Sequence, residues 1–387
     1  MKRALQAEGI LFIRDIEREM KGMSEEGIAK LIRSDLVAFG GYTPAKSPEA
    51  VAEMVKVPVE GIIKLDANEN PYGCSPRVKQ ILGSYPHFNI YPDANQTEFR
   101  KLLQGYTGVG AEHIMASSGS DQLIDLVLRL FVAPGDEVIN CVPTFDMFRF
   151  STAMCNGKLV EVPRDENYLV NVSAVKKAIS KKTKIIVLAN PNNPTGTPIP
   201  KQDILELVDT GVPVMADEAY AEFSGETVTQ LVTRYKNLMV LRTFSKWAGL
   251  AGLRIGYGIF PVKIAEYLLK IKLPYSVNVA AVVAVRESLK DIDYLMNKVK
   301  AIVAERERLF GELSKLKWLK PFPSRANFIF CHVLNGKASQ IQQELERRGI
   351  LVRYFDQPLL RNSLRISVGK PEHTDALMKA LKEIGEK

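Results

Sequence analysis

The chain has 387 residues, of which 46% are hydrophobic, and a formal net charge of +8 from 52 basic and 44 acidic residues. That length can bury one large core or two medium ones. The sequence contains no helix-turn-helix signature, RNA-binding aromatic motif or long Lys/Arg run, so we expect no nucleic-acid partner. Anionic small molecules explain the positive charge economically, and a generally basic surface explains it about as well.

Membrane association and metal binding are not expected either. No apolar run reaches the length of a membrane span. The four cysteines and four histidines show no paired or metal-ligand spacing, which predicts a reducing compartment and no metal site. The acidic first thirty residues argue against a transit peptide, and a secretory apolar segment is missing. We therefore expect a cytoplasmic protein.

The predicted elements begin with residues 1–33, an N-terminal extension in which four apolar residues allow a short amphipathic helix: Leu11, Ile13, Ile16 and Met20. Residues 71–285 are predicted to form a large α/β domain. Its apolar runs are continuous rather than alternating, which indicates a mostly parallel sheet covered by helices on both faces. Seven strands are expected, at residues 113–116, 137–141, 159–162, 185–188, 212–215, 238–241 and 255–260. Intervening helices such as 122–131 and 203–210 fit right-handed crossovers.

The pattern changes after residue 274. A long helix is predicted over residues 279–316, followed by strands at 328–332, 351–354 and 364–368 and helices at 339–348 and 374–384. This pattern predicts a smaller α+β domain over residues 286–387. We expect residues 34–70 to join that small domain.

The most informative motif follows the predicted strand 238–241. It reads Thr-Phe-Ser-Lys over residues 243–246 and Gly-Leu-Ala-Gly-Leu-Arg over residues 249–254. A lysine at such a turn, Lys246, can form an imine with an aldehyde cofactor. The hydroxyls of Thr243 and Ser245, together with Arg254, could hold a phosphate of that cofactor. Taken alone, the motif also fits a surface turn with a solvated lysine.

Two further motifs close predicted strands. Asn193 lies in Asn-Pro-Asn-Asn-Pro-Thr-Gly over residues 190–196, and Asp217 and Tyr220 lie in Ala-Asp-Glu-Ala-Tyr over residues 216–220. An Asp at the carboxyl end of a parallel strand points into the crevice where such sheets bind ligands. Asp217 could pair with a protonated pyridine nitrogen, while Asn193 and Tyr220 could hydrogen-bond the ring hydroxyl.

With these motifs, the chain resembles the fold-type I pyridoxal-phosphate aminotransferases, and among them the histidinol-phosphate aminotransferases. The resemblance runs from about residue 34 to the C-terminus. Besides the lysine motif, it rests on four segments: Leu-Asp-Ala-Asn-Glu-Asn-Pro-Tyr-Gly over 65–73, Tyr-Pro-Asp over 91–93, the Asn-Asn-Pro-Thr-Gly turn, and Leu-Arg-Ile-Ser-Val-Gly over 364–369. It implies pyridoxal 5′-phosphate as cofactor, with Lys246 as the imine-forming and proton-moving base and with Asp217 and Tyr220 assisting.

The resemblance also assigns the cofactor phosphate. Gly119, Ser120 and Asp121 stand between a predicted strand and helix, where free amides and the helix dipole form a phosphate cradle. The resemblance adds Thr243, Ser245 and Arg254. The negative charge of Asp121 is tolerable there only if its side chain turns away.

Two aromatic residues complete the implied cofactor site. Phe145 corresponds to the ring that stacks on the pyridine, and the same residue is also readable as a core phenylalanine. Tyr91 corresponds to a tyrosine that reaches the cofactor phosphate of the neighbouring subunit. The resemblance therefore implies a homodimer with shared active sites, whereas an exposed loop tyrosine is the alternative.

The implied substrate site contains Tyr42, Asn193, Arg353 and Arg365. A guanidinium suits a carboxylate or a phosphate, and two arginines suit a dianionic phosphate better than one carboxylate. The expected reaction is transamination between L-histidinol phosphate and 2-oxoglutarate, giving imidazole acetol phosphate and L-glutamate in histidine biosynthesis.

Other functions compete with this one. The same cofactor could serve an aromatic amino-acid aminotransferase or a decarboxylase of a phosphorylated amino acid. A non-catalytic regulator would need an added nucleic-acid-binding domain or loss of the lysine, and Lys246 is present. A nicotinamide dehydrogenase fits poorly, because no Gly-x-Gly-x-x-Gly motif follows a strand at the head of the sheet.

Overall fold

The computed structural model describes residues 29–37, 39–41 and 46–385. The chain divides into two compact units, residues 1–43 and 44–387. In the first unit, the short helix α3 (Ser34–Val37) begins beside an ion pair between Arg33 and Asp35, at 2.7 Å. The helix predicted around residues 11–20 lies outside the described residues.

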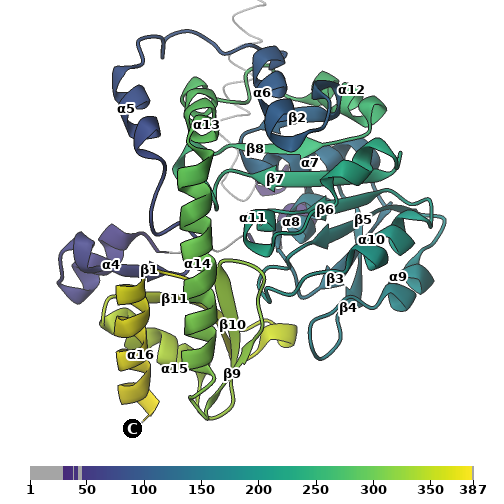
Figure 1. The fold of residues 1–387 in the computed structure, drawn as a ribbon. Coiled ribbons are helices and arrows are strands. Elements are labelled where there is room, and N and C mark those ends of the chain that lie inside the picture. Colours follow the sequence, from purple (N-terminus) through teal and green to yellow (C-terminus); the bar gives the residue numbers. More distant parts are fainter. Residues whose placement is uncertain (1–28, 38, 42–45, 386–387) are drawn as a thin grey trace, which may run out of the picture. The chain divides into compact units, whose positions relative to one another are not determined.

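The larger sheet has seven strands in the order β2-β8-β7-β6-β5-β3-β4 (Figure 1). Strand β8 is antiparallel to both of its neighbours, and the other neighbouring pairs are parallel. The strands are β2 (Ile114–Ser117), β3 (Glu137–Val142), β4 (Lys158–Pro163), β5 (Thr183–Ala189), β6 (Val214–Asp217), β7 (Leu238–Thr243) and β8 (Gly256–Ile259). This confirms the predicted α/β class and the mostly parallel seven-stranded sheet.

Successive residues of one strand pack into different cores. On β5, Ile186 and Leu188 belong to the main core, whereas Ile185 and Val187 pack with α7 (Gly119–Phe131) and α12 (Val262–Ile271). All four side chains are at most 1% exposed. Helices on both faces of the sheet therefore explain the continuous apolar runs in the sequence.

The smaller sheet has five strands in the order β1-β11-β12-β10-β9. They are β1 (Ile63–Leu65), β9 (Leu319–Phe322), β10 (Phe328–Val333), β11 (Ile350–Phe355) and β12 (Ser363–Ser367). Strand β1 pairs with β11, so a segment from early in the sequence joins the sheet made by the end of the chain. The sequence pattern did not predict the short strands β1 and β9. The proposed domain boundaries stay predictions.

The remaining α-helices are α4 (Pro48–Val55), α5 (Pro76–Ser84), α6 (Thr97–Thr107), α8 (Met147–Met154), α9 (Val172–Ala178), α10 (Lys201–Val208), α11 (Ala221–Ser224), α13 (Val279–Lys290), α14 (Ile292–Leu313), α15 (Ala338–Arg347) and α16 (Pro371–Gly385). Among the described residues, no helix is both long and apolar enough to cross a membrane.

The single helix predicted over residues 279–316 is wrong. Asp291 separates α13 from α14 and has a non-helical backbone, with φ −118° and ψ 31°. Its carboxylate accepts a hydrogen bond from the Ser75 hydroxyl. A short polar side chain that finds a partner outside the helix favours such a break. After the break, α14 runs along the smaller sheet (Figure 1).

Candidate active site

Most predicted site residues converge because they follow parallel strands. Asp217 ends β6, Thr243 ends β7, Asn193 follows β5, Phe145 follows β3 and Gly119 opens the helix after β2. The carboxyl ends of parallel strands lie at one edge of a sheet, which is where open α/β sheets bind ligands. The topology therefore gathers residues that lie more than one hundred positions apart in the sequence.

Lys246 is held from the segment that follows β1. Its Nζ donates to the Ala67 carbonyl oxygen at 3.1 Å, and the Asn70 side chain donates to the Trp247 carbonyl oxygen at 2.9 Å. Gly249, at φ +67°, permits a close approach, since an added Cβ would lie 2.3 Å from the Gly73 oxygen. The turn over residues 246–249 is therefore held in contact with residues 67–74.

Burial, followed by the nearby Arg365 guanidinium, lowers the pKa of Lys246 to about 8. Arg254 acts in the same direction, while Glu69 and Asp121 oppose it. An amine with this pKa is partly neutral near physiological pH, and only the neutral form can attack a carbonyl or accept a proton.

Asp217 is 5% exposed and accepts a hydrogen bond from the Ala219 amide at 3.0 Å. Burial raises its pKa to about 7, and the carboxylates of Asp121 and Glu218 add to this effect. Lys246 lowers the pKa, which shows that the amine lies within electrostatic range of the carboxylate. A cation placed against Asp217 would stabilise its charged form.

Arg365 contacts a predicted cofactor residue directly. Its Nη1 donates to Asn193 Oδ1 at 2.6 Å, and its Nη2 donates to the Asp66 carbonyl oxygen at 2.5 Å. Arg353 stands opposite Arg365 across the antiparallel pair β11–β12. Directly opposite residues project on the same face of a sheet, and like charges there repel. The register therefore brings two arginines together on one face of the sheet, an arrangement that suits an anion.

Tyr220 is 5% exposed, and its hydroxyl accepts a hydrogen bond from Asn68 Nδ2 at 3.0 Å. The edge of its ring faces Phe328, with ring centroids 5.2 Å apart. This position fixes the phenol next to the smaller sheet.

The predicted phosphate residues gather at the start of α7. An added Cβ at Gly119 would lie 2.6 Å from Arg254 Nη2, so the guanidinium lies directly against the helix N-terminus. Arg254 also forms an ion pair with Asp121, at 3.0 Å. The first amides of a helix have no partner within it and favour an anion.

The sequence analysis expected the Asp121 side chain to turn away from the phosphate, and in the structure its carboxylate pairs with the Arg254 guanidinium. Nearby, the Ser245 amide donates to the Thr243 hydroxyl at 3.1 Å. Both residues are at most 6% exposed. Their hydroxyl groups thus lie within the protein at the end of β7.

Phe145 is half-buried and packs with its ring edge against Phe148, with centroids 6.1 Å apart. Because the side chain is only partly buried, both readings of this residue, a stacking ring and a core phenylalanine, stay open.

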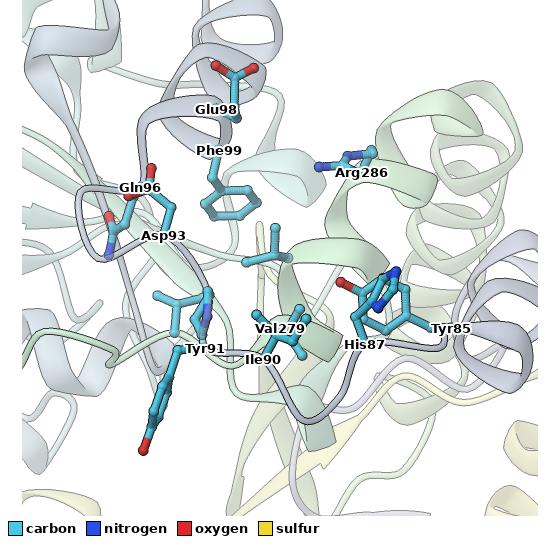
Figure 2. Close-up of a pocket in the computed structure, with 13 residues that line it drawn as sticks. Tyr85, His87, Ile90, Tyr91, Asp93, Gln96, Glu98, Phe99, Val279 and Arg286 are labelled. Carbon is cyan, nitrogen blue, oxygen red and sulfur yellow. The ribbon is translucent and has the colours of Figure 1, made fainter.

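Tyr91 lies apart from the lysine. Its side chain is 76% exposed and stacks on Tyr275, with ring centroids 4.4 Å apart. It borders a pocket of about 310 Å³, and its ring extends away from His87 and Phe99 (Figure 2). Among the described residues, Tyr91 is the only predicted site residue that lines this pocket.

Tyr42 lies outside the described residues. Within the described part of the chain, no group of three or more His, Cys, Asp or Glu side chains could hold a metal ion. The sequence analysis gave no role to Asn68, Ala67 or Asp66, although each contacts a predicted site residue. Their signal was the Asp-Ala-Asn-Glu-Asn run directly after an apolar strand.

The chain is similar to known proteins over most of its length. The family described as aminotransferase class I and II matches residues 60–381. A histidinol-phosphate aminotransferase of Dehalococcoides mccartyi is 57% identical over 359 residues, covering 93% of this chain and 99% of that protein. One from Roseiflexus castenholzii is 47% identical over 366 residues, covering 92% and 99%.

A solved structure is also similar. The histidinol-phosphate aminotransferase of Sinorhizobium meliloti, in complex with pyridoxal-5′-phosphate, has a TM-score of 0.79 and 26% identity, and the match covers 91% of this chain and 99% of that one.

Proposed function

The chain belongs to the class I and II aminotransferase family, and from this premise we propose that it transfers the amino group of L-histidinol phosphate to 2-oxoglutarate. The products are imidazole acetol phosphate and L-glutamate, in histidine biosynthesis, and the cofactor is pyridoxal 5′-phosphate. The observation that carries the proposal is the half-buried Lys246, whose lowered pKa and neighbours Asp217 and Arg365 suit imine and proton chemistry. The cytoplasmic location stays a prediction.

The residues present fit this cofactor. Asp217 is a buried carboxylate with a raised pKa, and a protonated ring nitrogen would supply the cation that stabilises its charge. The amides of Ser120 and Asp121, with the Arg254 guanidinium against Gly119, form an anion cradle for its phosphate. A guanidinium has five donors, so Arg254 can serve Asp121 and a phosphate together.

Bound at this site, the cofactor supplies an electron sink for the substrate α-carbon. Lys246 would then be the base that moves the α-carbon proton to the cofactor C4′ atom, the 1,3-shift that defines transamination. Asp217 would keep the ring nitrogen protonated, Asn193 and Tyr220 would donate to the ring hydroxyl, and Phe145 would stack on the ring.

The amide orientation of Asn193 supports its role. Because Asn193 Oδ1 accepts from Arg365, its Nδ2 is the group that can donate to the ring hydroxyl. The same contact joins the proposed substrate arginine to a proposed cofactor residue. Arg365 and Arg353 would then hold the phosphate of the amino donor, because two guanidinium groups on one sheet face match a dianion.

The functional unit is proposed to be a homodimer in which Tyr91 of each chain serves the cofactor phosphate of the other. Tyr91 stacks on Tyr275, and exposed apolar side chains lie close to both residues in the sequence. Phe88, Ile90 and Leu273 are 54%, 57% and 69% exposed. Apolar surface of this kind is typical of subunit interfaces.

An amino-donor panel tests the proposal. The protein is given histidinol phosphate, phenylalanine and threonine phosphate with 2-oxoglutarate, and both keto product and carbon dioxide are measured. We expect the highest kcat/KM for histidinol phosphate and no carbon dioxide. A preference for phenylalanine would instead favour an aromatic aminotransferase, and carbon dioxide release a decarboxylase.

A further inference from the structure

Asn68 makes a set of buried contacts that the proposed mechanism does not use. It is 2% exposed and has a left-handed backbone, at φ 56°. Its amide nitrogen donates to the Tyr220 hydroxyl at 3.0 Å, and its side-chain oxygen accepts from the Ser367 hydroxyl at 2.9 Å. Its backbone amide also donates to the Ser367 hydroxyl, at 2.8 Å, and its carbonyl accepts from Asn327 at 3.0 Å.

These contacts determine the orientation of the Asn68 side chain. Since the side-chain oxygen accepts from Ser367, the nitrogen is the atom that faces Tyr220. The backbone and the side chain are both fixed by β12 and by the segment before β10, so Asn68 has little freedom to rotate. Asparagine also tolerates the left-handed conformation better than most residues.

Strand β12 supports two site residues at once. Arg365 and Ser367 are two positions apart on this strand and therefore project on the same face. Arg365 orients the side chain of Asn193, and Ser367 orients that of Asn68, which in turn contacts Tyr220. Both residues proposed to donate to the cofactor ring oxygen are thus held from the strand that carries the substrate arginine.

We propose that Asn68 is a positioning residue that strengthens Tyr220 as a hydrogen-bond donor and couples it to β12; this inference rests on the proposed function. A hydroxyl that accepts a hydrogen bond becomes a better donor of its own proton, because linked hydrogen bonds polarise one another. Donation to the ring oxygen stabilises the anionic form of that oxygen and lowers the pKa of the bound cofactor. Loss of Asn68 should therefore raise that pKa.

The test is a pH titration of the absorbance of the bound cofactor. Asn68→Gly removes the side-chain amide and still permits the left-handed backbone conformation. We expect it to raise the apparent pKa of the bound cofactor by roughly one unit, the scale of a lost hydrogen bond to a charged group. Asn68→Asp should raise it further, because a carboxylate accepts the Tyr220 proton and adds negative charge. Ser367→Ala should give a smaller rise.

Asn237→Ala is the matched control. Asn237 directly precedes β7 and donates to the carbonyl oxygens of Val208 and Val212, which precede β6. It therefore lies at the start of these two strands, whereas the proposed cofactor residues lie at their carboxyl ends. It should lower the thermal stability of the cofactor-free protein without moving the cofactor pKa. If Asn68→Gly and Asn68→Asp both bind the cofactor with the wild-type pKa, the inference is overturned. If the wild-type protein binds no cofactor at all, the proposed function is contradicted, and with it the inference about Asn68.

Discussion

At the end of β6, two adjacent buried carboxylates have opposite surroundings. Glu218 is 0% exposed and accepts from Arg242 at 3.2 Å, from the Thr227 hydroxyl at 2.5 Å and from the Val228 amide at 2.7 Å. Asp217 accepts from the Ala219 amide, and within the described part of the chain no cationic side chain lies within ion-pair distance of it. Asp217 is the last residue of β6, and Glu218 directly follows it, with its backbone amide donating to the Leu241 carbonyl oxygen of β7.

This difference distinguishes Glu218, which stabilises the fold, from Asp217, which is proposed to bind the cofactor. Arg242 also forms an ion pair with Glu222, at 2.6 Å, and Glu222 accepts from the Tyr106 hydroxyl at 2.9 Å. Glu218 thus belongs to a network that holds β6, β7, α6 and α11 together. Burial raises the pKa of both carboxyl groups, but Glu218 has Arg242, Thr227 and Val228 as partners, whereas Asp217 accepts from one backbone amide, so a ligand cation can contribute binding energy at Asp217.

The largest effect is expected at Lys246, which belongs to the surroundings of Asp217 and not to the network of Glu218. Lys246→Ala should lower transamination by roughly a millionfold, the scale seen when a covalent catalytic group is removed. Borohydride reduction of the wild-type protein should fix the cofactor on Lys246, as read by peptide mapping. Lys64→Ala is the control, because Lys64 forms an ion pair with Glu69 at 2.7 Å and should be dispensable. A label on another lysine would remove the catalytic assignment.

The comparison itself is tested by changing each carboxylate to its amide. Asp217→Asn should lower kcat about a thousandfold, the scale of a lost electrostatic contact to the reacting group, with a folded protein. Glu218→Gln should keep kcat within about tenfold but lower the free energy of unfolding by ~3 kcal/mol, since Arg242 loses a buried partner. Steady-state kinetics and denaturant unfolding measure both. Equal kinetic losses in the two variants would contradict the separation.

The pH dependence of stability provides a third test, in the cofactor-free protein. The pKa of Asp217 rises from an ordinary 3.8 to about 7 on folding, so its protonated form is favoured in the folded state. The contribution of Asp217 to wild-type stability should therefore fall as pH rises from about 4 to 7, and Asp217→Asn should lack that contribution. The stability advantage of the variant should grow across this window by up to about 4 kcal/mol.

Lys246 does not disturb this window. Its pKa is lowered on folding from 10.5 to about 8, so its contribution makes stability rise between pH 8 and 10.5, and it does so in both proteins. Unfolding curves at several pH values between 4 and 7 measure the difference. A constant gap between wild type and variant would mean that Asp217 is not desolvated in solution.

A smaller effect is expected at the paired arginines. Arg353→Ala should lower kcat/KM for histidinol phosphate about ten- to a hundredfold and that for phenylalanine much less, because a charged hydrogen bond to phosphate is lost. Arg365→Ala should impair both donors. Arg361→Ala, at an exposed position, is the control. Equal losses for both donors in Arg353→Ala would remove the argument for a phosphorylated substrate.

The sequence predicted the positions of the strand-end residues, because each follows a buried apolar run and parallel strands bring their carboxyl ends together. Asp217, Asn193 and the lysine turn are of this kind. It could not predict Asn68, whose partners Tyr220 and Ser367 lie 152 and 299 positions away, because contacts at such separations depend on how the two sheets pack. The same reason explains the missed strand β1, which is short and pairs with β11.

The smallest expected effect concerns Tyr91, which is far more exposed than the residues around Asp217. Tyr91→Phe should weaken cofactor binding by about fivefold, the scale of one hydroxyl hydrogen bond, if the partner chain supplies that hydroxyl. A Tyr91→Phe chain with intact Lys246 is mixed with a Lys246→Ala chain with intact Tyr91. In the mixed dimer, the site that contains Lys246 receives the partner's intact tyrosine, so its cofactor affinity should return to the wild-type value. Tyr267→Phe, on an exposed helix face, serves as the control. Affinity equal to that of the Tyr91→Phe homodimer would show that each chain completes its own site.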